Sequence, residues 1–551
     1  MKKLLALLLA ALMVLSSGMV ALADEGSEPA WAEYDAMINE IRTTSDMAAR
    51  AQLMHKAEDM LMATGAICPI YYYTDLFMAK ESLTGYYANL FGTKFFLYSD
   101  LGDATTLRLC LASEPAKLDP ALNSSVDGAT LATHAFGGLY TFDAEGNYKP
   151  NFATGYEVSE DGLTYTFAIR DGLTWSDGTP LTAKDFEYSW KRAANPTTAS
   201  DYGYMFDVIA RDENGELLVS ASEDGKALTV TTVARLAYIL NLAAFPTFFP
   251  VQEAAVESAP EADTNPGAWA LEAGFPCSGP YILESWEHNV SMVYVKNPNY
   301  WDAANVKVER LEFMLSDDDV AIYSAYQNGD LDFIDTVPTD QIASLQGNPE
   351  YHVIPTLGTY YISFNVKSPL FDGKTVEQAA AMRIAFAKLI DRQYIVDTVG
   401  QAGQVPANTF VIAGMTDGNG QIFTDPANYP VDGGYFGLEV DVEGAIELLK
   451  SAGYEFDDNG MLSANTPISF EYLTNNTSGH IAIAECVQQD LAAVGITMTI
   501  KSIDWAVFLD ERKAGNYDVA RNGWLADFND PINLLEMWTT ESGNNDCQFG
   551  R

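Results

Sequence analysis

Residues 159–192 read SEDGLTYTFAIRDGLTWSDGTPLTAKDFEYSWKR, and this stretch carries the clearest structural signal in the chain. Apolar and polar side chains alternate from Tyr156 to Trp175 around glycine-containing turns, which predicts paired antiparallel strands. Ala183–Ala194 then has the apolar spacing of a helix, and Asn195-Pro196 predicts the end of that helix. The stretch therefore predicts a unit that mixes strands with a helix.

The same mixture continues along the chain, which predicts an α/β fold. The 551 residues are enough for two to four domains, each with its own core. Aromatic or β-branched runs predict further strands at Ile67–Tyr73, Leu107–Leu111, Leu228–Val233, Tyr281–Trp286 and Met292–Lys296. Helical apolar spacing predicts helices at Asp35–Thr64, Val376–Ile390, Val442–Ala452 and Ile481–Val494.

The chain is strongly acidic, with a formal net charge of −45. Lys and Arg are the residues that bind phosphate backbones, so this charge argues against a nucleic-acid partner. Anionic lipid surfaces are disfavoured for the same reason. Apolar residues make up 48% of the chain and charged residues 19%, which is the composition of a globular protein.

Residues 1–23 have the pattern of a secretory signal peptide. Two lysines precede a continuous apolar run, and Ala21-Leu22-Ala23 is a small-x-small cleavage site, so we expect the mature chain to begin near Asp24. A membrane anchor is disfavoured because Ser16-Ser17-Gly18 interrupts the run before it reaches a span of about 20 residues. No Leu-x-x-Cys lipidation site is visible in the sequence. We therefore expect export to the periplasm or the cell exterior without a lipid anchor.

No enzyme signature is found in the sequence. Nucleophile-elbow, zinc-protease, P-loop and dinucleotide-binding motifs are all missing, and the five cysteines and five histidines lack metal-ligand spacing. Asp317-Asp318-Asp319 lacks the pattern of a calcium loop and is interpreted as the solvent-exposed start of a helix. We expect no catalytic residues, no metal and no cofactor. A secreted glycosidase or peptidase remains the alternative from a different class.

The loop Ala520–Pro531, ARNGWLADFNDP, is the best candidate binding segment. It follows the strand-like run Tyr517–Ala520 and brings together Arg521, Trp524 and Asp527. A carboxylate, a guanidinium and a large aromatic face are the groups that hold a zwitterion. The alternative is a surface Arg–Asp pair beside a core tryptophan.

Several long motifs resemble the extracytoplasmic oligopeptide-binding proteins of ABC transporters, solute-binding protein family 5. The 159–192 stretch is the most specific of them. The others are SEPAKLDP (113–120), SGPYILESWEHN (278–289), KNPNYW (296–301), LGTYYISFN (357–365), AFAKLIDR (385–392) and YDVARNGWLADFNDP (517–531).

This resemblance implies a type II periplasmic-binding-protein fold. Two α/β lobes would be joined by two crossing strands, near Tyr71–Asp75 and Leu357–Ser363, with a small extra domain on the first lobe. The implied function is the binding of short peptides, without catalysis, by a monomer that delivers them to the permease subunits of an ABC importer. Another solute, such as a nickel chelate, an oligosaccharide or haem, is the alternative within the same fold.

The resemblance also assigns roles to individual residues. Asp527 resembles the carboxylate that pairs with the α-amino group of the peptide, and Arg521 and His480 resemble groups that meet its carboxyl end. Leu525 stands where some relatives carry a cysteine, so the disulfide of those relatives should be absent. Trp524 and Trp505 resemble pocket walls, and Ser124–Val126 and Gly523–Leu525 resemble backbone that pairs with an extended peptide. Tyr202 matches a family tyrosine of the small domain near the ligand.

The order of the segments differs from that of the family. Trp31–Asp75 resembles the closing section of such proteins, whereas the opening section starts only at Thr105, so the chain looks circularly permuted, with Ser99–Asp103 as the new linker. The alternative is an artefact of the gene model. The permuted order predicts part of lobe two at 24–75, lobe one at 76–358 with its small domain at about 135–235, and the rest of lobe two at 359–551.

Overall fold

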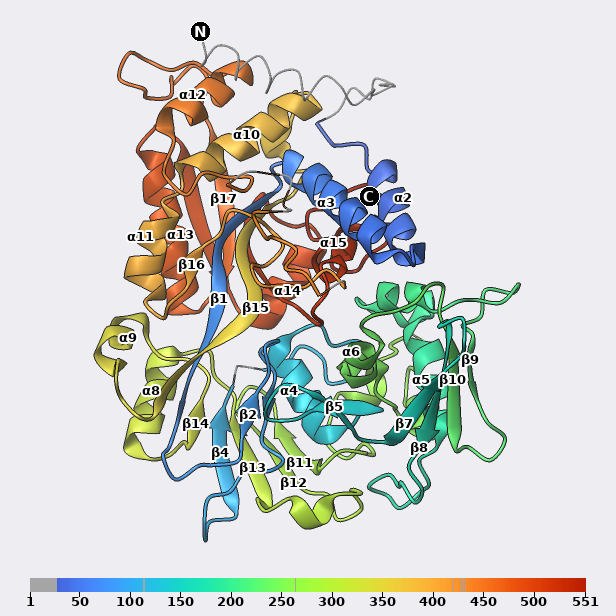
Figure 1. The fold of residues 1–551 in the computed structure, drawn as a ribbon. Helices are drawn as coiled ribbons and strands as arrows, with labels where there is room; N and C mark the ends of the chain where they lie inside the picture. Colours follow the sequence, from blue (N-terminus) through green and yellow to red (C-terminus); the bar gives the residue numbers. More distant parts are fainter. Residues whose placement is uncertain are drawn as a thin grey trace.

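The computed structural model describes residues 27–551 apart from 112–113, 263, 419, 428, 430 and 432. The signal peptide predicted at residues 1–23 therefore lies outside the described residues. Figure 1 shows two α/β lobes, one above the other, connected by two long strands. None of the helices within the described residues has the length and apolarity that a bilayer-spanning segment needs.

The two long strands are β1 (Ile67–Ala79) and β15 (Tyr351–Phe364), which pair antiparallel at the centre of an eleven-stranded sheet. Their aromatic side chains suit a pleated surface, and the rings of Tyr71 and Tyr360 stack across the pair at 4.9 Å. One end of β1 pairs with β14 (Phe333–Ile334) in the lower lobe, while β15 pairs with β19 (Val519–Leu525) in the upper lobe. The prediction of two crossing strands is confirmed.

Lobe one, the lower lobe in Figure 1, is built on parallel strands that end at the same edge of the sheet. A hairpin extends this part of the sheet, and helices cover it. The parallel strands are β4 (Thr106–Cys110), β13 (Arg310–Met314) and β14; the hairpin is β11 (Tyr281–Glu287) with β12 (Ser291–Lys296); the helices include α4 (Val126–Ala135), α8 (Asp319–Asn328) and α9 (Thr339–Leu345).

The 159–192 stretch forms part of a separate antiparallel sheet beside lobe one, in the strand order β7-β8-β10-β9. The predicted strand pair is β7 (Ala153–Val158) with β8 (Thr164–Ile169), and the predicted helix is α5 (Ala183–Ala193). Helix α5 begins with a capping box and buries Trp190 completely. Both predictions are confirmed. The sheet is completed by β9 (Val219–Ala221) and β10 (Ala227–Thr231).

Lobe two continues the large sheet through β19 to two parallel strands, with helices on its faces. Its strands are β17 (Ser469–Asn475) and β18 (Thr497–Ile503), and its helices include α10 (Val376–Leu389), α12 (Val442–Ser451), α13 (Ser478–Ala492), α14 (Trp505–Lys513) and α15 (Ile532–Leu535). Two helices from the beginning of the chain, α2 (Ala32–Thr43) and α3 (Met47–Ala63), pack on this lobe.

The prediction of one helix over Asp35–Thr64 is wrong, because the chain breaks between α2 and α3. Thr44 is extended, and the Asp46 side chain accepts hydrogen bonds from the N–H groups of Ala48 and Ala49, both at 3.0 Å. A threonine pair followed by Ser-Asp offers caps that compete with a continuous helix. The two helices therefore form a hairpin.

This helical hairpin is fastened to the last segment of the chain. The Trp31 ring stacks on Phe549 with 3.9 Å between centroids, and its indole N–H donates to the carbonyl of Trp538 at 2.7 Å. Arg50 makes two hydrogen bonds of 2.8 Å to the buried carboxylate of Asp530. Both chain regions therefore share one core.

Candidate functional site

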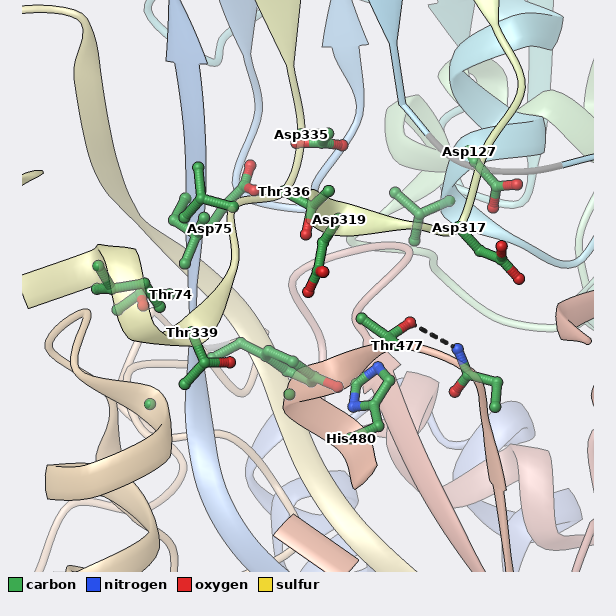
Figure 2. Close-up of a pocket in the computed structure, with 18 of the residues that line it drawn as sticks. Thr74, Asp75, Asp127, Asp317, Asp319, Asp335, Thr336, Thr339, Thr477 and His480 are labelled. Atoms are coloured by element: carbon green, nitrogen blue, oxygen red, sulfur yellow. Dashed lines mark hydrogen bonds between the residues drawn. The ribbon is translucent and has the colours of Figure 1, made fainter. Parts of the chain in front are cut away.

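Two adjoining cavities, of about 280 and 420 Å³, lie between the lobes. Each is lined by residues from both lobes, and Figure 2 shows the larger one. The smaller cavity contains Asp527, Trp524, Tyr202 and Ser124, whereas the larger one contains His480. The residues that line both are Tyr73, Val126, Asp127, Trp505, Arg521 and Leu525.

Asp527 is a partly buried carboxylate held from both lobes. The Tyr202 hydroxyl donates to its Oδ1 at 3.0 Å, and the Asn533 amide donates to its Oδ2 at 2.8 Å. Desolvation raises the pKa of Asp527 to about 7; these two hydrogen bonds oppose the rise, and the negative charge of Glu536 adds to it. Among the described residues, no Lys, Arg or His nitrogen lies within 4.0 Å of this carboxylate. The carboxylate is thus available to a cation that enters the cleft.

Asn533 positions Asp527 and was missed by the sequence analysis. Its side-chain oxygen accepts from the Trp524 indole N–H at 3.1 Å and from the Asp527 backbone N–H at 2.9 Å. The side chain is fully buried at the start of α15. No sequence motif predicts that an asparagine six residues after Asp527 forms hydrogen bonds with the backbone and side chain of that loop. The aromatic wall of the pocket is completed by Tyr202, whose ring lies 6.0 Å from that of Trp524.

Arg521 is a buried cation that packs on aromatic rings. Its guanidinium lies over the rings of Trp505 and Phe508 at 5.0 and 5.1 Å, and its Nε donates to Asn475 at 2.9 Å. Among the described residues, no carboxylate oxygen lies within 4.0 Å of it. Burial lowers the pKa of Arg521, yet a guanidinium stays charged in proteins. The arrangement suits an anionic ligand group.

His480 lies at the start of α13, and its ring stacks on Tyr360 at 5.6 Å between centroids. Desolvation, and then the charge of Arg521, hold the pKa of His480 well below its usual value. Its Nδ1 is buried, and no described residue forms a hydrogen bond with it. His480 is therefore a neutral group that offers one unused hydrogen-bonding position to the cavity.

The β19 backbone has an uncovered strand edge inside the cleft, although the Gly523 N–H already donates to the Asn522 side chain at 2.8 Å. One edge of Gly523, Trp524 and Leu525 pairs with β15, whereas β17 pairs with β19 only at Val519 and Ala520. Within the described chain, no strand covers the other edge of Gly523–Leu525. A Cβ atom at position 523 would lie 2.2 Å from the Tyr73 hydroxyl oxygen, so any other residue there would require the Tyr73 ring to move. An open edge of this kind can accept an extended peptide.

Ser124 forms part of a contact between the lobes. Its hydroxyl donates to Asp201 at 2.9 Å and accepts from the Lys513 ammonium at 2.5 Å, and Lys513 also pairs with Asp201. Lys513 belongs to α14 of lobe two, whereas Ser124 precedes α4 of lobe one. Val126, the first residue of α4, lines both cavities. These contacts hold the lobes together on the side of the smaller cavity.

A fold of two lobes that close over a polar cleft defines a solute-binding protein. The chain belongs to the bacterial extracellular solute-binding proteins, family 5, whose profile matches residues 147–546. The sequence-based prediction of family and fold is thereby confirmed. The chain is 32% identical to the oligopeptide-binding protein OppA of Bacillus subtilis over 455 residues, which cover 80% of this chain and 78% of the relative. It is 31% identical to the periplasmic oligopeptide-binding protein OppA of Salmonella typhimurium, with 82% and 80% covered.

Solved structures of similar proteins have the same architecture. Haemophilus influenzae OppA in complex with the peptide RPPGFSPFR is 27% identical, with a TM-score of 0.70 and coverage of 82% of this chain and 85% of that one. Listeria monocytogenes OppA bound to peptide is 28% identical, with a TM-score of 0.71 and coverage of 81% and 86%.

Asp527→Asn is expected to stabilise the ligand-free protein at pH 8. An acid whose pKa is raised by folding destabilises the folded state increasingly from its unfolded pKa of about 3.9 up to its folded pKa, here about 7. Removing the charge should add about 1–2 kcal/mol to the free energy of unfolding at pH 8, and less than half of that at pH 5. An asparagine can still accept from Asn533 and donate to the Tyr202 oxygen. Urea unfolding at both pH values measures the gain; an equal gain at both, or a loss at pH 8, would contradict the assignment.

Proposed function

We propose that this protein binds short peptides in the cleft between its lobes and delivers them to the permease of an ABC importer. The observation that carries this proposal is the Asp527 carboxylate, which forms no ion pair with any described residue and lies just beyond the uncovered β19 edge. The names of the similar oligopeptide-binding proteins support it. The protein would act outside the cytoplasm as a monomer, without catalysis, after removal of residues 1–23.

The proposed binding mode uses the two ends of a peptide and its backbone. The α-ammonium group would replace the missing cation at Asp527, with Trp524 and Tyr202 around the first side chain. The backbone would pair with Gly523–Leu525 and with the Ser124–Val126 segment opposite. Arg521 would meet the carboxylate of peptides of suitable length, and His480 would donate or accept one hydrogen bond beside it. Because the peptide contributes mainly ammonium, carboxylate and backbone groups, many sequences would fit.

Blocking the peptide amine tests this mode directly. Trialanine should bind, whereas N-acetyl-trialanine should bind at least about 100-fold more weakly, because it leaves the Asp527 carboxylate desolvated and unpaired. Calorimetry on the full chain provides both dissociation constants. In the Asp527→Asn variant the two peptides should differ far less. Equal affinities of the wild-type protein for both peptides would move the amine site elsewhere.

We also infer that the chain is circularly permuted, with lobe two assembled from 24–75 and 359–551 and lobe one from 76–358, including the small domain at about 135–235. The close packing of Trp31 on Phe549 supports this inference, because a direct connection between these regions would be short. The proposed linker Ser99–Asp103 includes a surface turn at Gly102, whose N–H bonds to Asp100 at 2.8 Å. A new chain end is well tolerated at such a turn.

Restoring the family order tests the inference. A chain that starts at Ala104, runs to Arg551, continues through a short glycine linker into Glu28 and ends at Gly102 should fold. Its free energy of unfolding should agree with that of the original chain within about 1 kcal/mol, and its affinity for trialanine should be unchanged, since no cleft contact is cut. Failure of the reconnected chain to fold or to bind trialanine would contradict the inference.

A further inference from the structure

The larger cavity has an acidic wall that belongs to lobe one. In Figure 2 the carboxylates of Asp335, Asp319, Asp317 and Asp127 stand above His480, which belongs to lobe two. Asp317 follows β13 and Asp335 follows β14, and these two strands are both parallel to β4, so their ends meet at one edge of the sheet. The topology thus gathers the acids on one side of the cleft.

The charges on this wall are not balanced. Lys94 lies 2.9 Å from the Asp75 carboxylate and 2.8 Å from that of Asp335. Among the described residues, neither Asp127 nor Asp317 has a Lys, Arg or His nitrogen within 4.0 Å. The cation of Arg521 also lines the cavity but forms no ion pair with any of the five carboxylates. The closed cavity therefore holds a surplus of negative charge.

The sequence interpretation of Asp317-Asp318-Asp319 as the solvent-exposed start of a helix is only partly right. Asp318 is exposed and caps α8 by accepting from the N–H of Ala321 at 2.9 Å. Asp319, however, is only 6% exposed, because the first turn of α8 packs against the start of α13, where the Ser478 hydroxyl donates to it. The closing of lobe two over lobe one buries this acid.

Unsatisfied hydrogen-bonding atoms independently point to a ligand in the same cavity. Thr356 is 7% exposed and lines the cavity, and its buried hydroxyl oxygen has no hydrogen-bond partner among the residues that the structure describes. Asp127 Oδ2 is likewise buried and accepts no hydrogen bond from the described part of the chain, and burial raises the pKa of Asp127. Such atoms destabilise a closed cleft unless a donor reaches them.

The chemistry of the wall identifies the class of ligand group. Carboxylate and hydroxyl oxygens call for a group with positive charge and several N–H donors. Within the described residues, no three His, Cys, Asp or Glu side chains are placed to share a metal ion, so the acids are too spread out for a metal site and suit an organic cation. A cavity of about 420 Å³ has room for a long side chain.

We propose that this cavity is a subsite for a lysine or arginine side chain of the bound peptide, so that the protein prefers peptides with a basic residue at one position after the first. The inference rests on the proposed peptide-binding function and adds a side-chain preference to it. The ammonium or guanidinium group would lie among Asp127, Asp317 and Asp319, the three acids that Lys94 does not neutralise.

A positional scan tests the subsite. Tetraalanine is the parent, and Lys, Gln or Glu is placed at its second, third or fourth position. At one position the Lys peptide should bind about tenfold tighter than the Gln peptide, and the Glu peptide should bind more weakly than either. At the other two positions Lys and Gln should differ by less than about threefold. Calorimetry on the full chain at pH 7.5 gives the constants.

The acids are tested with a matched control. The double variant Asp127→Asn and Asp317→Asn should bring the Lys-to-Gln ratio at the selective position close to one. Asp340→Asn removes an exposed carboxylate of the same lobe that lies outside the cavity, and it should leave the ratio unchanged. This control separates the local site from the general attraction of an acidic protein for cations.

Each outcome decides the question. A Lys preference of equal size at all three positions, equal affinities for Lys and Gln everywhere, or a preference that survives in the double variant would overturn the subsite. If no peptide of the set binds, including tetraalanine, the proposed function itself fails. Peptides that bind without any Lys preference would leave the proposed function standing and refute only the subsite.

Discussion

The rest of this structure depends on the Asp527 carboxylate. Both lobes desolvate it, and no described residue supplies a cation to pair with it. Asp527 is fixed by Asn533 from its own loop and by the Tyr202 hydroxyl from the small-sheet region beside lobe one. Its environment is therefore complete only when the lobes meet. Closing the empty cleft desolvates Asp527, Asp127 and Arg521, and each cost falls when a ligand supplies the opposite charge. The closed cleft is therefore less stable when it is empty than when it holds a charged solute.

The two lobes are connected by paired strands and not by a flexible linker. β1 and β15 pair along most of their length within one sheet, where β1 also pairs with β14 of lobe one and β15 with β19 of lobe two. The pairing of β15 with β19 fixes Gly523–Leu525 directly beside the crossing strands, next to Tyr73. The hairpin α2–α3 leads into β1 while it packs on the last segment of the chain, so lobe two depends on contacts between residues about 500 positions apart.

Much of this arrangement could be predicted from the sequence, because its signals are local or belong to long motifs. Alternation predicted β7 and β8, helical apolar spacing predicted α5, and the aromatic run ICPIYYY predicted the beginning of β1. The break at Thr44–Asp46 was missed because the flanking apolar spacing runs through it. Asn533, the Tyr202–Asp527 contact and the acidic wall were not predictable from pattern, since each depends on chain segments that only the closed fold brings together.

The central claim is that Asp527 changes from a desolvated acid to one half of an ion pair when a peptide binds. Calorimetry of trialanine binding at pH 6, in buffers of different ionisation enthalpy, counts the protons exchanged. In the closed, ligand-free cleft the pKa of Asp527 is about 7. Peptide binding to this form should release about 0.9 proton per peptide, because most Asp527 side chains are protonated beforehand and ionised afterwards. The Asp527→Asn variant should release close to none. No proton release from the wild-type protein, or equal release from both, would contradict the account.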